Sequence, residues 1–68
     1  MDITIRANET GEDLTITTDR IDMAKEQQPN FTIDAKYVVA DLLEKWGSNC
    51  DWWDAYDEHD NWVTGSEV

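Results

Sequence analysis

The stretch from Ile33 to Trp46, IDAKYVVADLLEKW, is the clearest secondary-structure element in this chain of 68 residues. Its apolar side chains recur at helical spacing along one stripe, which is typical of an amphipathic helix packed on a core. Thr32 precedes the stretch as the expected N-cap, and Gly47 follows it as the expected left-handed residue at the C-terminal end. The pattern therefore predicts one main helix over about residues 33–46. Its apolar stripe comprises Ala35, Val38, Val39, Leu42, Leu43 and Trp46.

Two short segments nearer the N-terminus, residues 2–6 and 13–17, alternate apolar and polar side chains. Alternation with many Ile and Thr residues predicts half-buried β-strands. The polar segment between them contains Gly11, which suits a turn. We expect an antiparallel hairpin covered by the main helix, because two strands alone are not stable in water.

The remaining segments are more ambiguous. Residues 18–27 predict a short helix capped by Thr18 and ending before Pro29. After the main helix, Ser48 is expected to open a second, shorter helix that is acidic and rich in Trp. Residues 62–64 suit either a short strand or an ordered tail. The expected fold is therefore α+β, a single domain over residues 1–68 in which the N-terminal hairpin packs against the main helix and the shorter helix follows.

Charge is the most informative property of the composition. Sixteen acids against five bases give a formal net charge of −11 and a pI of about 4.1. A field of this sign disfavours nucleic acids and anionic membranes as direct partners and favours basic protein surfaces. The chain has no apolar run long enough to span a membrane and no expected signal peptide, so we expect a cytoplasmic location.

Catalytic and metal-binding groups are scarce. Cys50 and His59 are the only cysteine and histidine of the chain, and therefore the candidates for a nucleophile and its base. They are nine residues apart across the expected second helix, so we expect their side chains to point in different directions. A calcium-binding loop beginning at Asp57 fails at two required positions, which hold Trp62 and Val68. Zinc would require more Cys or His ligands than the chain contains. We therefore expect no enzymatic activity, no cofactor and no metal, with His59 a solvated loop residue.

All four tryptophans lie within the last 23 residues. Trp46 and Trp52 fall on apolar stripes and are expected in the core. Trp52 and Trp53 are adjacent and would project about 100° apart on a helix, so both cannot be buried equally. Either one of this pair or Tyr56 is therefore expected near the surface, where an aromatic side chain among carboxylates suits an interface anchor.

The chain from Trp46 to Val68 holds six acids and no Lys or Arg. On a helix, Asp51, Asp54 and Asp57 would follow one another at about 4.5–6 Å along the axis. This spacing is similar to that of charges along a nucleic-acid strand. A solvated face that maintains solubility is the alternative. The absence of compensating bases favours a binding role, because unpaired like charges destabilise a helix.

In size, charge and the acidic cluster at residues 51–60, the chain resembles the small phage-encoded inhibitors that mimic DNA, including anti-CRISPR and anti-restriction proteins. These inhibitors have many folds, so the resemblance implies a mechanism and not a topology. It implies that the protein occupies a site lined by Lys and Arg on a basic nucleic-acid-binding protein or effector complex, such as a CRISPR–Cas complex, in the cytoplasm of the host cell. No turnover and no direct contact with nucleic acid would be involved.

The contacts expected for this mechanism are five carboxylates, together with Trp53 or Tyr56 as an apolar anchor. A second acidic ridge is expected at residues 19, 22 and 26. The alternative function is an antitoxin-like or regulatory module that docks through exposed aromatic side chains. Sensitivity to salt distinguishes the two, since charge pairing weakens with added salt and apolar contact does not. The five carboxylates are Asp51, Asp54, Asp57, Glu58 and Asp60, and the ridge is Asp19, Asp22 and Glu26.

Overall fold

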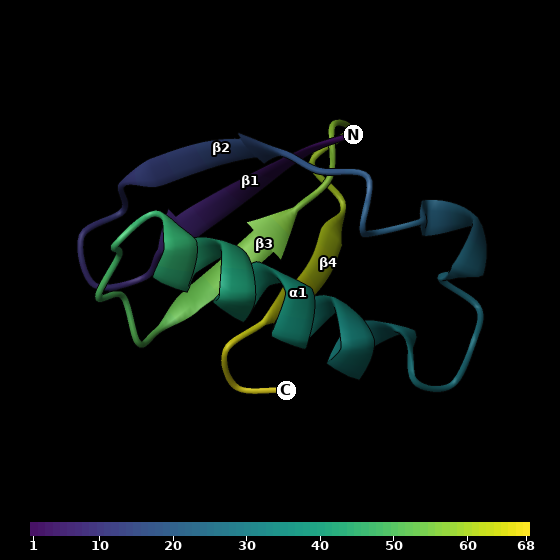
Figure 1. Ribbon diagram of the computed structural model, residues 1–68. Helices are drawn as coiled ribbons and strands as arrows, with labels where there is room; N and C mark the ends of the chain where they lie inside the picture. The colour runs from purple at the N-terminus through teal and green to yellow at the C-terminus, as the bar shows by residue number, and fades with distance from the viewer.

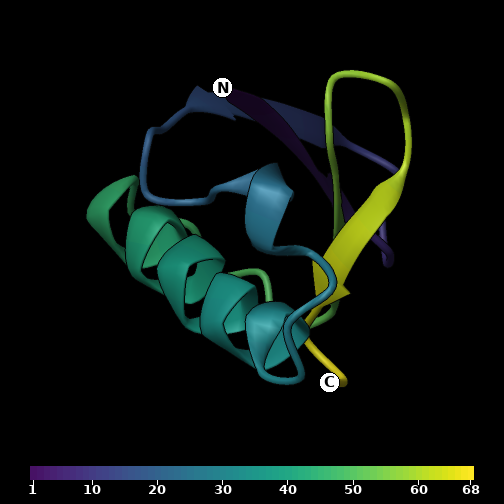
Figure 2. The same ribbon diagram turned by 90° about the vertical axis from the view of Figure 1, so that its right-hand side faces the viewer.

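A computed structural model, which describes residues 1–68, contains one α-helix and one four-stranded antiparallel sheet with strand order β2-β1-β3-β4. The helix α1 lies across one face of the sheet (Figure 1), and no element covers the other face (Figure 2). The elements are β1 (Asp2–Ala7), β2 (Asp13–Thr17), the 3-10 turn η1 (Met23–Lys25), α1 (Phe31–Lys45), β3 (Trp53–Tyr56) and β4 (Trp62–Gly65).

Strands β1 and β2 form the expected N-terminal hairpin. Ile3 pairs with Ile16 and Ile5 with Leu14, so the apolar side chains of both strands point to the face that α1 covers. Gly11 adopts a φ of +74° in the connecting turn, a conformation that glycine adopts without steric cost.

Residues after the main helix form a strand and not a second helix. β3 pairs with the free side of β1, placing Ala55 opposite Ile5. Trp53 and Ala55 are buried on the helix side, whereas Asp54 and Tyr56 point to the opposite face. The prediction of a shorter acidic, Trp-rich helix is therefore wrong. A helix here would leave one side of β1 without hydrogen-bond partners and would bring unpaired carboxylates together.

Strand β4 completes the sheet, so residues 62–64 are part of a strand and not an ordered tail. A bulge between β3 and β4 allows the consecutive residues Val63 and Thr64 both to be buried. The Thr64 hydroxyl donates to the carbonyl oxygen of Thr32 at 2.8 Å, which fastens β4 to the first turn of α1.

The helix begins earlier than its sequence pattern suggests. Asn30 occupies the N-cap without a side-chain hydrogen bond, so the expected cap, Thr32, lies inside the first turn. At the other end, Gly47 has a φ of +70° and donates to Glu44, while Ser48 donates to Leu43. These two hydrogen bonds form a Schellman motif that ends the helix where Gly47 predicts.

The connection from β2 to α1 contains only the single 3-10 turn η1. The Asp22 carboxylate accepts from the Ala24 N–H at 3.0 Å and caps this turn. The Thr18 hydroxyl instead accepts from the Arg20 N–H, so the short helix expected to be capped by Thr18 does not form. Ile21 is buried and anchors the connection to the core.

The core lies between α1 and the inner face of the sheet. Helix residues at positions 35, 39 and 43 meet apolar side chains from all four strands. The helix is neither long enough nor apolar enough to cross a membrane. The ten core residues are Ile3, Ile5, Ile16, Ile21, Ala35, Val39, Leu43, Trp53, Ala55 and Val63.

Candidate partner-binding surface

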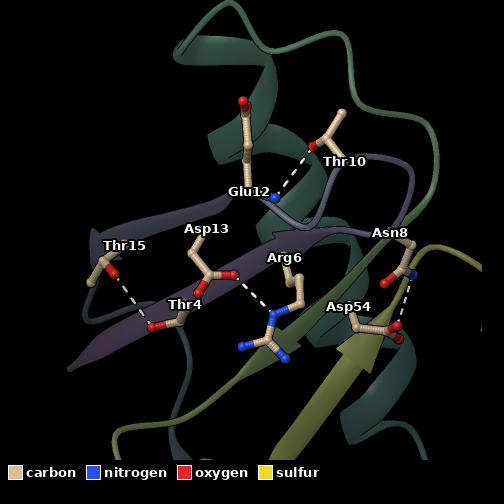
Figure 3. A network of polar contacts seen from close by, with 8 residues as sticks. All are labelled: Thr4, Arg6, Asn8, Thr10, Glu12, Asp13, Thr15 and Asp54. Carbon is tan, nitrogen blue, oxygen red and sulfur yellow. Dashed lines mark hydrogen bonds and ion pairs between the residues drawn. The ribbon is translucent and has the colours of Figure 1, made fainter.

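The sheet face opposite α1, here called the open face, carries polar and aromatic side chains from every strand. Figure 3 views part of this face, with α1 behind the sheet. Alternation along each strand places these side chains opposite the core. Its main members are Asp2, Thr4, Arg6, Asp13, Thr15, Thr17, Asp54, Tyr56 and Trp62.

Arg6 is the basic side chain of the open face and lies near the end of β1. Its Nε donates to Oδ1 of Asp13 at 2.9 Å (Figure 3). Its guanidinium carbon lies 5.1 Å from the centroid of the Tyr56 ring. The hydrogen bond to Asp13 raises the pKa of Arg6, and the negative charges of Asp13 and Asp60 add to the effect. The one base on this face is therefore already paired, which leaves the face acidic.

Asp54 binds two neighbours on the open face. One carboxylate oxygen accepts from Nδ2 of Asn8 at 2.8 Å, and the other accepts from the indole N–H of Trp62 at 3.0 Å. Gly65, opposite Asp54 on β4, leaves space for this carboxylate, because a Cβ there would lie 2.6 Å from Asp54 Oδ1. Asp54 thus fixes the Trp62 ring on the surface.

Asp57 stabilises the turn between β3 and β4. Its Oδ1 accepts from the backbone N–H groups of His59 and Asn61 at 2.8 and 2.9 Å, and the residue is only 8% exposed. The backbone hydrogen bond from Asn61, followed by that from His59, lowers the pKa of the Asp57 carboxyl. Asp57 is a structural anion inside the turn.

The other three expected carboxylates lie on the surface at two separate places. Glu58 accepts from the backbone N–H of Asp2 at 2.9 Å, which joins the β3–β4 turn to the N-terminus. Asp51 precedes β3 and Asp60 follows it, and both side chains are exposed with no hydrogen bond or ion pair. The five carboxylates therefore do not form the helical row that the sequence suggested.

The aromatic side chains are distributed differently from the prediction. Trp53 is 4% exposed and belongs to the core, so it is not available as an anchor, and Tyr56 is half-buried beside Arg6. Trp46 and Trp52, expected in the core, are 64% and 48% exposed. Trp62 is 49% exposed. The sequence signal for Trp62 was its place in residues 62–64, which suit a short strand after a turn. That segment was too short to predict which of its side chains would be exposed.

Seven of the sixteen carboxylates take part in hydrogen bonds or ion pairs, and nine do not. Of the expected second ridge, Asp22 caps η1 and the other two are free. The free carboxylates are Glu9, Glu12, Asp19, Glu26, Asp34, Glu44, Asp51, Asp60 and Glu67.

The bases are mostly occupied by contacts within the chain. Arg20 and Lys45 both reach Asp41, at 2.6 and 3.2 Å, and these hydrogen bonds, that from Arg20 first, lower the pKa of the Asp41 carboxyl. Lys36 donates to the carbonyl oxygen of Val68 at 2.8 Å. Together with the paired Arg6, this leaves Lys25 as the only base without a partner.

Reactive side chains do not converge anywhere. Cys50 and His59 lie beyond opposite ends of β3, and His59 is exposed as expected. No group of three or more His, Cys, Asp or Glu side chains is arranged to hold a metal ion. Comparisons of this chain with models of protein families, with curated proteins and with solved structures found no match.

Proposed function

We propose that this protein is a non-enzymatic inhibitor that binds a basic nucleic-acid-binding protein and blocks its DNA site. The observation that carries the proposal is the imbalance of free charge, with nine carboxylates but only one base lacking a partner within the chain. A surface with this imbalance attracts a cationic cleft and repels nucleic acid.

The contacts proposed for this inhibitor differ from the helical row inferred from the sequence. Asp51 and Asp60 are free and exposed, so both are able to meet Lys or Arg side chains of a partner. Trp62, half exposed and held in place by Asp54, supplies the apolar anchor in place of Trp53. An exposed tryptophan is among the side chains most often found at interface hot spots, and the hydrogen bond to Asp54 orients this one.

The proposed partner is an effector complex with a Lys- and Arg-lined nucleic-acid site, such as a CRISPR–Cas complex, and the proposed location is the cytoplasm. If the protein is encoded by a phage, that cytoplasm belongs to the host cell. The inhibitor would require neither direct contact with nucleic acid nor contact with a membrane.

A second function, a regulatory or antitoxin-like module that docks through aromatic side chains, is favoured by one specific observation. Three of the four tryptophans are about half exposed or more, although a small protein normally needs such large side chains for its core. This module would bind an apolar surface and would be much less sensitive to salt.

The test is capture of partners from a host lysate on the immobilised protein, with washes at increasing NaCl, followed by identification of the captured proteins. The proposal predicts a nucleic-acid-binding protein that is released by salt and displaced by its own DNA. Capture that resists high salt supports the aromatic module instead. A captured protein that still binds DNA while bound to this chain contradicts the inhibitor proposal.

The double variant Asp51→Asn/Asp60→Asn tests the proposed charged contacts. We expect it to bind the captured partner about tenfold more weakly at low salt, with a flatter salt dependence, because two charge pairs are lost. The matched control is Asp34→Asn/Glu44→Gln, which removes the same charge from α1. Equal effects of the two variants would show that only net charge matters and would remove the case for Asp51 and Asp60.

A further inference from the structure

Strand β2 is an edge of the sheet, and its outer side is free along its length (Figure 1). At the two ends of the hairpin, the Ala7 N–H donates to the carbonyl oxygen of Glu12 and the Thr18 N–H donates to that of Met1. These two hydrogen bonds establish which residues of β2 are hydrogen-bonded to β1. Because antiparallel pairs alternate, the backbone groups of residues 14 and 16 face β1. Those of Asp13, Thr15 and Thr17 face outward, where they can accept another strand.

This edge lacks the devices that usually prevent strand addition. The central residues of β2, from Leu14 to Ile16, include no charge and no proline, and no bulge interrupts the pairing with β1. Asp13 is the only charged residue in the strand, and Arg6 pairs with it on the open face. The edge is therefore competent to extend the sheet.

A cavity of about 270 Å³ lies between the β1–β2 hairpin and the end of α1. Its apolar lining comes from Ile5, Ala7, Leu14, Leu43 and Cys50, and it has room for a branched aliphatic side chain. Leu14 belongs to β2 itself and is only partly buried. A strand added to this edge would alternate its side chains, placing every second one on the cavity side.

We propose that β2 binds an extended, cationic segment of a partner protein as a fifth strand, with an aliphatic side chain of that segment in the cavity. Glu12 and Asp13 line the cavity beside its apolar residues, and Glu9 is free in the adjoining turn. A second copy of this chain fits less well, because each copy carries a net charge of −11.

This inference rests on the proposed function for the basic character of the partner. It concerns the edge of β2, however, and not the part of the open face around Trp62. The segment would contribute backbone hydrogen bonds for affinity, with the cavity and the acids selecting its side chains. A short unstructured basic peptide is sufficient to occupy the edge, so the probe need not be the partner itself.

The probe is a blocked hexapeptide that alternates Lys and Val, titrated into the ¹⁵N-labelled protein and followed by amide chemical shifts. We expect saturable shifts centred on Asp13, Thr15 and Thr17, and no binding of the matching peptide in which Glu replaces Lys. Shifts centred on Trp62, or equal binding of both peptides, would overturn the proposal. Dimer formation without peptide, with shifts at β2, would overturn it in favour of a second copy.

The variant Thr15→Pro removes the central outward N–H of the edge. We expect the fold to tolerate this change because the N–H is not used in pairing with β1, and proline occurs on edge strands in this orientation. Thr15→Val is the matched control, since it loses the same side-chain contact with Thr4 but keeps the backbone donor. We expect Thr15→Pro to weaken binding of the Lys–Val peptide at least tenfold and Thr15→Val less than twofold.

Circular dichroism checks that Thr15→Pro is folded. If it is not, Cys50→Leu provides the second test, because it puts a bulkier side chain into the lining of the cavity and leaves the edge backbone intact. We expect it to weaken binding of the Lys–Val peptide at least fivefold, and unchanged affinity in either folded variant would refute the fifth strand.

The same variants separate this inference from the proposed function. If Thr15→Pro still captures the salt-sensitive partner at full strength, the inference fails while the proposed function stands. If the peptide binds at β2 but no nucleic-acid-binding protein is captured, the strand-addition site stands while the proposed function fails.

Discussion

Asp57 illustrates how, at the scale of single residues, a carboxylate marked by the sequence as a binding contact has become part of the fold. The turn between β3 and β4 directs two backbone N–H groups at one of its oxygens, and the Asn61 amide approaches the other at 3.4 Å. These donors stabilise the charged form, which is why the pKa of Asp57 is lowered. A variant that reverses the charge of Asp57 would disrupt the turn, so a loss of binding in that variant would not show that Asp57 contacts a partner.

We expect Asp57→Ala to lower the free energy of unfolding at pH 7 by about 1–3 kcal/mol, because two backbone donors lose their acceptor. Asp57→Asn keeps one acceptor oxygen and should have a smaller effect. Urea denaturation followed by tryptophan fluorescence measures both. The exposed neighbour Asp60, which has a φ of 62°, supplies the control, since Asp60→Asn keeps a residue that tolerates this conformation.

The pH dependence of this effect has a defined sign. The folded-state pKa lies below the ordinary value of 3.8, so the stability contributed by the Asp57 charge is fully present above that pH. It is lost as the pH falls through the lowered folded-state pKa. The difference in stability between wild type and Asp57→Asn should therefore shrink as the pH is lowered from about 5 to about 2. A difference that grew on acidification would show that the charge is not what the turn stabilises.

At the scale of elements, the segment from Ser48 to Glu58 was the least predictable because two patterns coexist in it. Trp52 and Tyr56 recur at helical spacing, whereas Trp53 and Ala55 recur at strand spacing. The strand conformation is favoured because β1 needs a hydrogen-bonding partner on its second side and because β4 pairs with the other side of β3. Both partners are distant in sequence, so local spacing carries no information about them.

The parts of the fold that the sequence did predict are those determined by local patterns. The β1–β2 hairpin follows from alternation around a short turn, and the end of α1 follows from Gly47. The candidate site was predicted less well, because it depends on contacts such as Asn8 with Asp54 that join opposite ends of the chain. The composition predicted an acidic surface, but it could not predict which carboxylates would remain without a partner in the folded chain.

The pairing of β3 with β4 yields a prediction at this scale. In Gly65→Ala, the new Cβ would lie 2.6 Å from Oδ1 of Asp54 and 3.3 Å from the carbonyl oxygen of Trp53. The carboxylate would have to leave Trp62, or the strands would have to separate. We expect a loss of about 1–3 kcal/mol in the free energy of unfolding, as for other overpacked sites.

A double-mutant cycle isolates the cause of this loss. In the background of Asp54→Ala the crowded oxygen is absent, so Gly65→Ala should cost much less than it does in wild type. Urea denaturation of all four proteins gives the coupling free energy. Equal costs in both backgrounds would mean that the contact with the Trp53 backbone, and not Asp54, makes glycine necessary at this position.

At the scale of the whole molecule, a net charge of −11 acts on a body with a radius of gyration of 10.9 Å. The nine free carboxylates form no ion pair with a base of the chain, so the folded state repels itself. At physiological ionic strength, salt screens the repulsion between exposed charges that are more than about 8–10 Å apart. Salt should therefore act in opposite directions on the free protein and on its proposed complex, stabilising the first and weakening the second.

We expect the melting temperature to rise as NaCl is increased from about 20 to about 500 mM, because the Debye length shortens. The triple variant Glu9→Gln/Glu26→Gln/Glu44→Gln removes three free charges and should melt roughly 2–5 °C higher than wild type at low salt, with a smaller response to added salt. Asp41→Asn is the control, because it removes a charge that Arg20 and Lys45 compensate and should lower the melting temperature. A melting temperature that fell with salt would show that ion pairs outweigh repulsion. The free charge would then be stabilised within the chain itself, and the main reason for expecting a basic partner would disappear.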